Sequence, residues 1–134
     1  MINSKLETLS SKQTQINKIQ NSKPYNLGDR TLKFSKRIII YVKGLSKAIT
    51  NSEISKQLIR SATSVGANYI EGEESLSKKD FTMRIKISRK EAKESVYWLN
   101  LSEPDESMKQ EKGCLIQEAT ELMKIFGSIA EKCK

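Results

Sequence analysis

Apolar side chains recur at spacings of three and four residues from Asp29 onward, which is the period of one face of an α-helix. In the first segment the apolar positions are Phe34, Ile38, Tyr41, Val42, Leu45 and Ile49. Lysine and arginine side chains fall on the other side of the same helix. Either Asp29 or Thr31 can cap its N-terminus. The pattern predicts a helix over residues 29–49 with an apolar core face and a basic outer face.

A second helix is predicted from about Ser52 to Glu71. Residues 50–52 (Thr-Asn-Ser) interrupt the first pattern and offer a fresh N-cap. Gly72 is expected to end the helix in the left-handed conformation. The apolar positions of this segment are Ile54, Leu58, Ala62, Val65 and Tyr69.

The opposite arc of the second helix carries a row of polar side chains, which we call the polar stripe. Its members are Arg60, Ser64, Asn68 and Glu71. Gly66 and Ala67, which lie within this segment, have almost no side chain and suit a close approach of another helix. The stripe is therefore either a polar contact that stabilises the fold or an interface with a partner, or it is part of an active site.

Two more helices complete the pattern. Ser77 or Ser75 can cap a third helix, whose core face is Phe81, Ile85, Ser88, Ala92, Ser95, Val96 and Leu99. A second apolar strip on this helix, which an oligomer could bury, comprises Met83, Ile87, Trp98 and Leu101. A loop around Pro104 precedes the last helix, predicted from about Lys109 to Cys133. Four helices with short loops favour an all-α, antiparallel up-down four-helix bundle over residues 25–134.

Residues 1–24 differ in composition from the rest of the chain. They are rich in Ser, Asn, Gln and Lys and end at Pro24, so we expect a flexible polar N-terminal arm. The chain has no apolar run near the roughly 20 residues needed to cross a bilayer, and its N-terminus lacks the apolar core of a signal peptide. These features predict a soluble cytoplasmic protein without a membrane partner.

The formal net charge of +8 is concentrated in the first third of the chain. A basic face can bind nucleic acid through its phosphates without reading bases, although a solvated lysine face explains the same pattern. The candidate contacts on the first and third helices are Lys33, Lys36, Arg37, Lys43, Lys47, Lys86, Arg89, Lys90 and Lys93. Tyr41 and Tyr69 are predicted to point inward, so we expect no aromatic platform for stacking bases.

The sequence offers few residues that could be catalytic. The chain has no histidine, which excludes a His general base and a His-Cys zinc site, and it lacks a phosphate-binding loop. Cys114 and Cys133 are far apart in sequence and are expected to be reduced and half-buried. A hydrolase using Glu71 or Glu91 is the remaining enzymatic interpretation. We predict no enzyme, no catalytic residues, no metal and no cofactor.

The polar stripe is interpreted first as a structural network. Arg60 and Glu71 are too far apart on one helix to pair, but a neighbouring helix or subunit could supply Arg84 and Glu91 as partners. The predicted structural polar network or oligomer seam comprises Arg60, Ser64, Asn68, Glu71, Arg84, Glu91 and Trp98. The alternative is a recognition surface using Arg60 and Asn68.

The segment from Gln57 to Leu101 contains RSATSVGANYIEG, then SKKDFTMRIKISRKEAKESVYWL. It resembles the four-helix bundle proteins encoded in intervening sequences of 23S rRNA genes, which read approximately RSxTSIGANxxEA and SKxDFxxKxxIxxKEAxEtxYWL; Gly72 replaces the usual Ala. The resemblance implies an up-down bundle in a ring-shaped homo-oligomer, commonly a pentamer. The related accessory proteins of diversity-generating retroelements are basic pentamers that bind nucleic acid and a reverse transcriptase.

Two functional hypotheses follow. The first is a non-enzymatic homo-oligomeric bundle that binds RNA or DNA non-specifically through its basic helix faces. The second is a protein-interaction scaffold or accessory subunit, for example for a reverse transcriptase.

Overall fold

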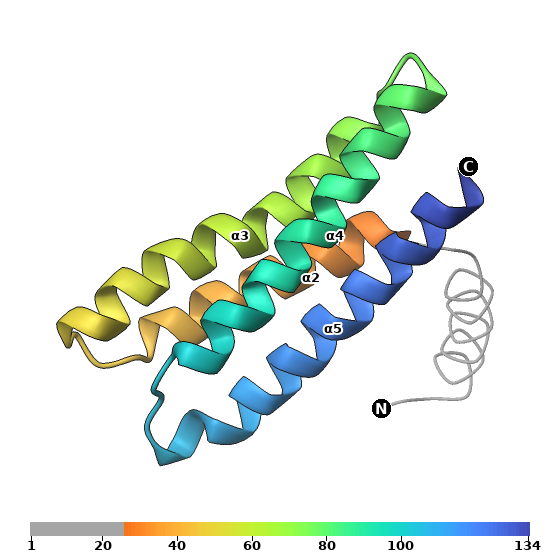
Figure 1. The fold of residues 1–134 in the computed structure, drawn as a ribbon. Coiled ribbons are helices and arrows are strands. Elements are labelled where there is room, and N and C mark those ends of the chain that lie inside the picture. The colour runs from red at the N-terminus through yellow and green to blue at the C-terminus, as the bar shows by residue number, and fades with distance from the viewer. Residues whose placement is uncertain (1–25) are drawn as a thin grey trace, which may run out of the picture. The chain divides into compact units, whose positions relative to one another are not determined.

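The chain consists of helices joined by short connections (Figure 1). A computed structural model describes residues 26–134; the predicted polar arm over residues 1–24 lies outside them. The helices are α2 (Leu27–Lys43), α3 (Ile49–Glu73), α4 (Lys78–Leu101) and α5 (Lys109–Lys132), with a short 3-10 turn η2 (Glu106–Met108) before α5. Residues 31–134 form one compact unit. Its helices pack against their neighbours in sequence, which confirms the predicted all-α, up-down four-helix bundle.

Helix α2 contributes large side chains to the core. Phe34, Ile38 and Tyr41 are fully buried, and the Tyr41 hydroxyl lies 2.6 Å from the Ser102 hydroxyl, which follows α4. The core face predicted from the apolar spacing is confirmed for these three residues. The predicted caps are wrong: α2 begins at Leu27, which places Asp29 in its first turn and Thr31 inside the helix.

The predicted end of the first helix is also wrong. Helix α2 stops at Lys43, and the Gly44 N–H donates to carbonyls of the preceding turn. Leu45 is buried in the connection, whereas Ile49 begins α3 and is 78% exposed. Glycine is a poor helix former, so the chain can leave the helix here while the three- and four-residue spacing continues by coincidence.

The polar run at residues 50–52 lies inside α3 instead of capping it. The N-cap is Ala48, which has extended backbone and no side-chain hydrogen bond. The buried Asn51 amide donates to the Ser46 hydroxyl (3.0 Å) and the Glu103 carbonyl (3.3 Å), and it accepts from the Glu103 N–H (3.2 Å). Asn51 therefore ties the α2–α3 connection to the chain that follows α4.

Gly72 does not end α3, which corrects the predicted stop. The helix continues through Glu73, and Gly72 is buried. A Cβ atom at this position would lie 3.2 Å from the Cβ of Arg84. Gly72 is therefore small because α4 passes close by, not because the backbone turns left-handed.

Small residues also govern the main contact between α3 and α4. The buried hydroxyls of Ser61 and Ser95 are 2.9 Å apart, and the Ser88 hydroxyl donates to the Val65 carbonyl over 2.8 Å. Serine adds little volume, and each hydroxyl has a partner, so the two backbones can approach without leaving buried polar groups unsatisfied. The α3–α4 contact is thus a small-residue seam, with Ala62 and Ala92 also fully buried.

Gly66 provides the corresponding close approach of α2 and α3. A Cβ atom at Gly66 would lie 2.8 Å from Thr31 Oγ1 and 3.0 Å from Thr31 Cβ. The close approach predicted for Gly66 is confirmed. For Ala67 the prediction is wrong, because a helix directs adjacent side chains about 100° apart and Ala67 faces solvent.

Helices α4 and α5 begin where expected. Ser77 is the N-cap of α4 and accepts a hydrogen bond from the Asp80 N–H (3.1 Å). The buried side chains of α5 are Leu115, Ala119, Leu122, Phe126 and Ala130. Both cysteines are free, but Cys114 is exposed and not half-buried as predicted, since it lies at the outer edge of the apolar face.

The two glycines Gly66 and Gly113 should respond in opposite ways to alanine. Gly66→Ala places a Cβ against Thr31, and we expect the free energy of unfolding to fall by roughly 1–2 kcal/mol despite the better helix propensity. At Gly113 no described heavy atom lies within 4 Å of the added Cβ, so Gly113→Ala should raise this free energy by up to about 1 kcal/mol. Urea unfolding followed by circular dichroism measures both. A shift in the same direction for the two variants would contradict the packing of Gly66.

Candidate functional site

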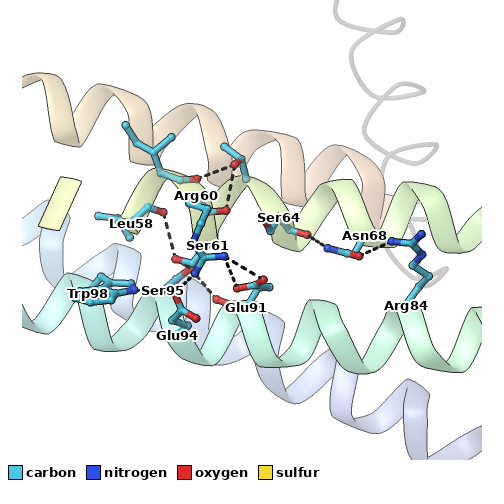
Figure 2. A network of polar contacts seen from close by, with 12 residues as sticks. Leu58, Arg60, Ser61, Ser64, Asn68, Arg84, Glu91, Glu94, Ser95 and Trp98 are labelled. Carbon is cyan, nitrogen blue, oxygen red and sulfur yellow. Dashed lines mark hydrogen bonds and ion pairs between the residues drawn. The ribbon is translucent and has the colours of Figure 1, made fainter. Parts of the chain in front are cut away.

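The polar stripe of α3 faces polar groups of α4 at two places (Figure 2). At the first, one Arg60 nitrogen lies 3.4 Å from both carboxylate oxygens of Glu91, and another contacts the Glu94 carboxylate. The Trp98 indole N–H donates to the same Glu94 carboxylate over 2.9 Å. The Glu91 side chain is only 10% exposed, while Arg60 is 48% exposed. We call Arg60, Glu91, Glu94 and Trp98 the ionic cluster.

At the second place, Asn68 connects the two helices. Its amide donates to the Ser64 carbonyl over 2.8 Å, and its oxygen accepts from Arg84 over 2.9 Å. Ser64 thus takes part through its backbone carbonyl. Glu71 is exposed, beyond this pair. Sequence reasoning named Arg84 and Glu91 as partners for the stripe; within the chain Arg84 bonds Asn68 and Glu91 bonds Arg60.

The electrostatics of the ionic cluster favour the charged forms of Arg60 and Glu94. The hydrogen bond from Trp98, then the bond and charge of Arg60, hold the pKa of Glu94 below its ordinary value, although partial burial opposes them. The bond to Glu94 raises the pKa of Arg60. Glu94 is absent from the polar network predicted from the sequence. The four-residue spacing from Glu94 to Trp98, which puts both on one helix face, was the available signal.

The predicted basic contacts do not form a single face. Lys43 and Lys47 join Lys56 of α3 around one hollow, which we call the α2–α3 hollow. Arg89, Lys90 and Lys93 of α4 join Lys124 of α5 around another, the α4–α5 hollow, with Met123 at its wall. These two hollows share no lining residue. The remaining predicted lysines, Lys33, Lys36 and Lys86, are exposed on α2 and α4 and line neither hollow.

Arg37 has a different environment from the other predicted contacts. Its guanidinium donates two hydrogen bonds to the Glu111 carboxylate, over 3.2 and 3.1 Å, and is partly buried. The bond to Glu111 raises the pKa of Arg37. This bidentate pair joins α2 to α5, so we leave Arg37 out of the candidate interface.

Within residues 26–134, no three His, Cys, Asp or Glu side chains gather closely enough to hold a metal ion. Among the helices in this part of the chain, none combines the length and the apolar character needed to cross a membrane.

The bundle is similar to a solved structure and matches one family of known proteins. A crystal structure from Bacteroides thetaiotaomicron, described as a protein with unknown function from the S23 ribosomal protein family, is similar to this chain. It shows 34% sequence identity and a TM-score of 0.65, covering 78% of this chain and 94% of the other. No curated protein matches. The family model of the 23S rRNA-intervening sequence protein matches residues 25–128, and the chain belongs to this family.

The ionic cluster should make stability depend on pH. Because the pKa of Glu94 is lower in the folded chain than its ordinary value of 4.5, the carboxylate stabilises the fold above that pH. This contribution is lost as the pH falls through the folded-state pKa. We therefore expect Glu94→Gln to lower the unfolding free energy near pH 7 and to differ progressively less from the parent chain as the pH falls below 4.5.

Urea unfolding at a series of pH values measures this effect. Glu74→Gln, a change of the same charge at an exposed residue after α3, is the matched control and should show little difference at any pH. A Glu94→Gln deficit that stays constant down to the acid limit would show that the carboxylate charge does not stabilise the fold.

Proposed function

We propose that this protein is a non-enzymatic nucleic-acid-binding bundle of the cytoplasm that contacts phosphates without reading base sequence. The observation that carries this proposal is the α4–α5 hollow, where Arg89, Lys90, Lys93 and Lys124 surround Met123. No carboxylate is among the residues that line it. Four cations around one concave surface provide a favourable potential for a phosphate backbone.

The four cations of this hollow lie outside the ion pairs of the fold, although the charge of Lys90 helps to lower the pKa of Glu94. Among the described residues none of the four cations forms a salt bridge, in contrast to Arg37 and Arg60. Gly127 of α5 lets the aliphatic part of Arg89 cross toward α5, since an added Cβ there would lie 3.4 Å from Arg89 Cδ. The hollow is about 540 Å³, within the roughly 300–1,000 Å³ range of ligand sites.

The α2–α3 hollow supplies a second, weaker group of cations. Lys43, Lys47 and Lys56 line it, but Lys56 also lies 3.6 Å from the Glu53 carboxylate. An exposed pair of this kind contributes little and can open to bind a phosphate. This hollow could extend contact with a long strand that the α4–α5 hollow has already bound.

Binding through the α4–α5 hollow should depend steeply on salt. If all four cations neutralise phosphates, the slope of log affinity against log salt concentration should be about −3 to −4. The double variant Lys90→Gln/Lys93→Gln should weaken binding and reduce the slope by roughly 1.5 to 2. Fluorescence anisotropy with labelled RNA and DNA, titrated at several salt concentrations, measures both quantities.

The matched control is Lys78→Gln/Lys79→Gln, which removes the same charge from the exposed first turn of α4. It should leave the slope nearly unchanged. Equal effects of the two double variants would show that total charge, and not this hollow, determines affinity. Absence of binding at low salt by the parent chain would end the proposal.

We also propose that the chain assembles with copies of itself, as the pentamer that the family resemblance implies. Large apolar side chains exposed on α2 support this proposal: Leu32, Ile39 and Ile40, the last 67% exposed. The strip expected to be buried in an oligomer supports it less, because Trp98 is half-buried and bonded to Glu94 within the chain. Met83 and Leu101 of that strip are exposed.

Light scattering on a sizing column should give five times the mass of one chain. Ile40→Asp should shift this mass toward that of a monomer, because it places a charge in an apolar contact. Leu76→Asp, at a fully exposed leucine between α3 and α4, is the control and should leave the mass unchanged. A monomeric parent chain would contradict the assembly.

A further inference from the structure

A second, mainly apolar hollow adjoins the basic one between α4 and α5. The residues that line it are Lys93, Glu94, Val96, Tyr97, Asn100, Thr120 and Met123. Lys93 and Met123 also line the α4–α5 hollow, so the two hollows form one surface. One end of this surface is cationic, and the other is apolar and aromatic.

Tyr97 provides an accessible aromatic ring at the apolar end. Its side chain is 58% exposed, and its ring packs edge-on against Trp98, with centroids 5.0 Å apart and planes at 76°. The Trp98 indole is in turn held by Glu94, which Arg60 contacts. The ionic cluster therefore fixes the neighbour on which Tyr97 rests, and an ordered ring loses little entropy when it binds.

The cations of α4 lie in register with this ring. Lys86, Lys90, Lys93 and Tyr97 follow one another at three- and four-residue spacings, which places them on one side of the helix at steps of about 5 Å. Phosphates held by the lysines would thus lead a strand directly to Tyr97. The carboxylate that lines the apolar hollow, Glu94, is already paired with Arg60, which limits its repulsion of a strand.

We propose that this surface binds single-stranded nucleic acid, with an unpaired base stacked on Tyr97 beside Met123 and the adjoining phosphates on Lys90, Lys93 and Lys124. Stacking requires the face of a base, which a duplex keeps covered. This inference rests on the proposed nucleic-acid binding and adds the class of strand. It differs from the expectation of no aromatic platform, which rested on Tyr41 and Tyr69. Tyr41 is buried and Tyr69 half-buried, whereas Tyr97 faces the basic surface.

A cationic, aromatic surface favours a nucleic acid over an apolar protein partner, because the charge complements phosphate and the ring accepts any base. The shared chemistry of RNA and DNA strands is an unpaired base next to phosphates. RNA and DNA strands are therefore tested separately. The experiment also shows whether a second copy of this chain occupies the same surface.

The test compares single-stranded oligouridine, oligothymidine and a blunt duplex, each of about 12 nucleotides, for binding to the full chain. Tyr97→Ala should weaken binding of at least one single strand by about 5- to 100-fold and leave the duplex nearly unchanged. Tyr97→Phe keeps the ring and should retain binding. Leu76→Ala, which removes an exposed apolar side chain elsewhere, should have no effect. Trp98, the single tryptophan, provides a label-free fluorescence signal next to the site.

The outcomes separate this inference from the proposed function. If the parent chain binds none of the three probes at low salt, nucleic-acid binding itself fails. If it binds them but Tyr97→Ala weakens the duplex as much as the strands, or has no effect on either, only the stacking inference is overturned. A change in oligomeric mass caused by Tyr97→Ala would likewise overturn it, since the ring would then belong to a contact between copies.

Discussion

The close approach of α3 and α4 is the constraint on which the rest of the bundle depends. Serine hydroxyls fill this seam where bulky apolar groups would hold the helices apart, and Ser61, Ser88 and Ser95 each have a hydrogen-bond partner. Within residues 26–134 no buried side-chain polar atom lacks a partner, so the seam carries no unmet desolvation cost. The same proximity brings Arg60 within reach of Glu91 and Glu94.

This arrangement assigns different tasks to the two sides of α4. Toward α3, Glu91 and Glu94 pair with Arg60, and Arg84 bonds the Asn68 amide, so polar contacts help to fix the register of the two helices. Toward α5, its cations form no salt bridge with any residue of the described part of the chain and surround a hollow next to an exposed aromatic ring. Glu94 and Trp98 link the two sides, because the carboxylate that anchors Arg60 also orients the indole beside Tyr97. A structural contact can thus support a binding surface without touching the ligand.

Much of the fold could be predicted from the sequence, because the core depends on periodicity. Phe34, Leu58, Ile85 and Leu99 are all at expected buried positions. The helix boundaries were less predictable. Asn51 has the chemistry of a cap, but its partner Glu103 is 52 residues away, and no local pattern reveals that contact. Gly72 is small because Arg84 of α4 lies close to it, and no local pattern reveals that contact either.

The candidate site, too, could be predicted from the sequence only in part. The basic residues of α4 were evident from the helical spacing, but their grouping with Lys124 depends on how α4 packs against α5. Arg37 shared the pattern of the other cations, and only its distance to Glu111 distinguishes it. The exposure of Tyr97 could not be predicted from the sequence, because it depends on how α4 packs against its neighbours.

The bidentate pair of Arg37 and Glu111 has a consequence for how the chain folds. Helices α3, α4 and α5 meet their partners across short connections, so these contacts close small loops and can form quickly. The contacts Arg37–Glu111 and Tyr41–Ser102 span 74 and 61 residues, and they secure α2 against the far part of the chain. Because the entropic cost of closing a loop grows with its length, these two contacts cost more to close than the contacts between helices that are neighbours in sequence.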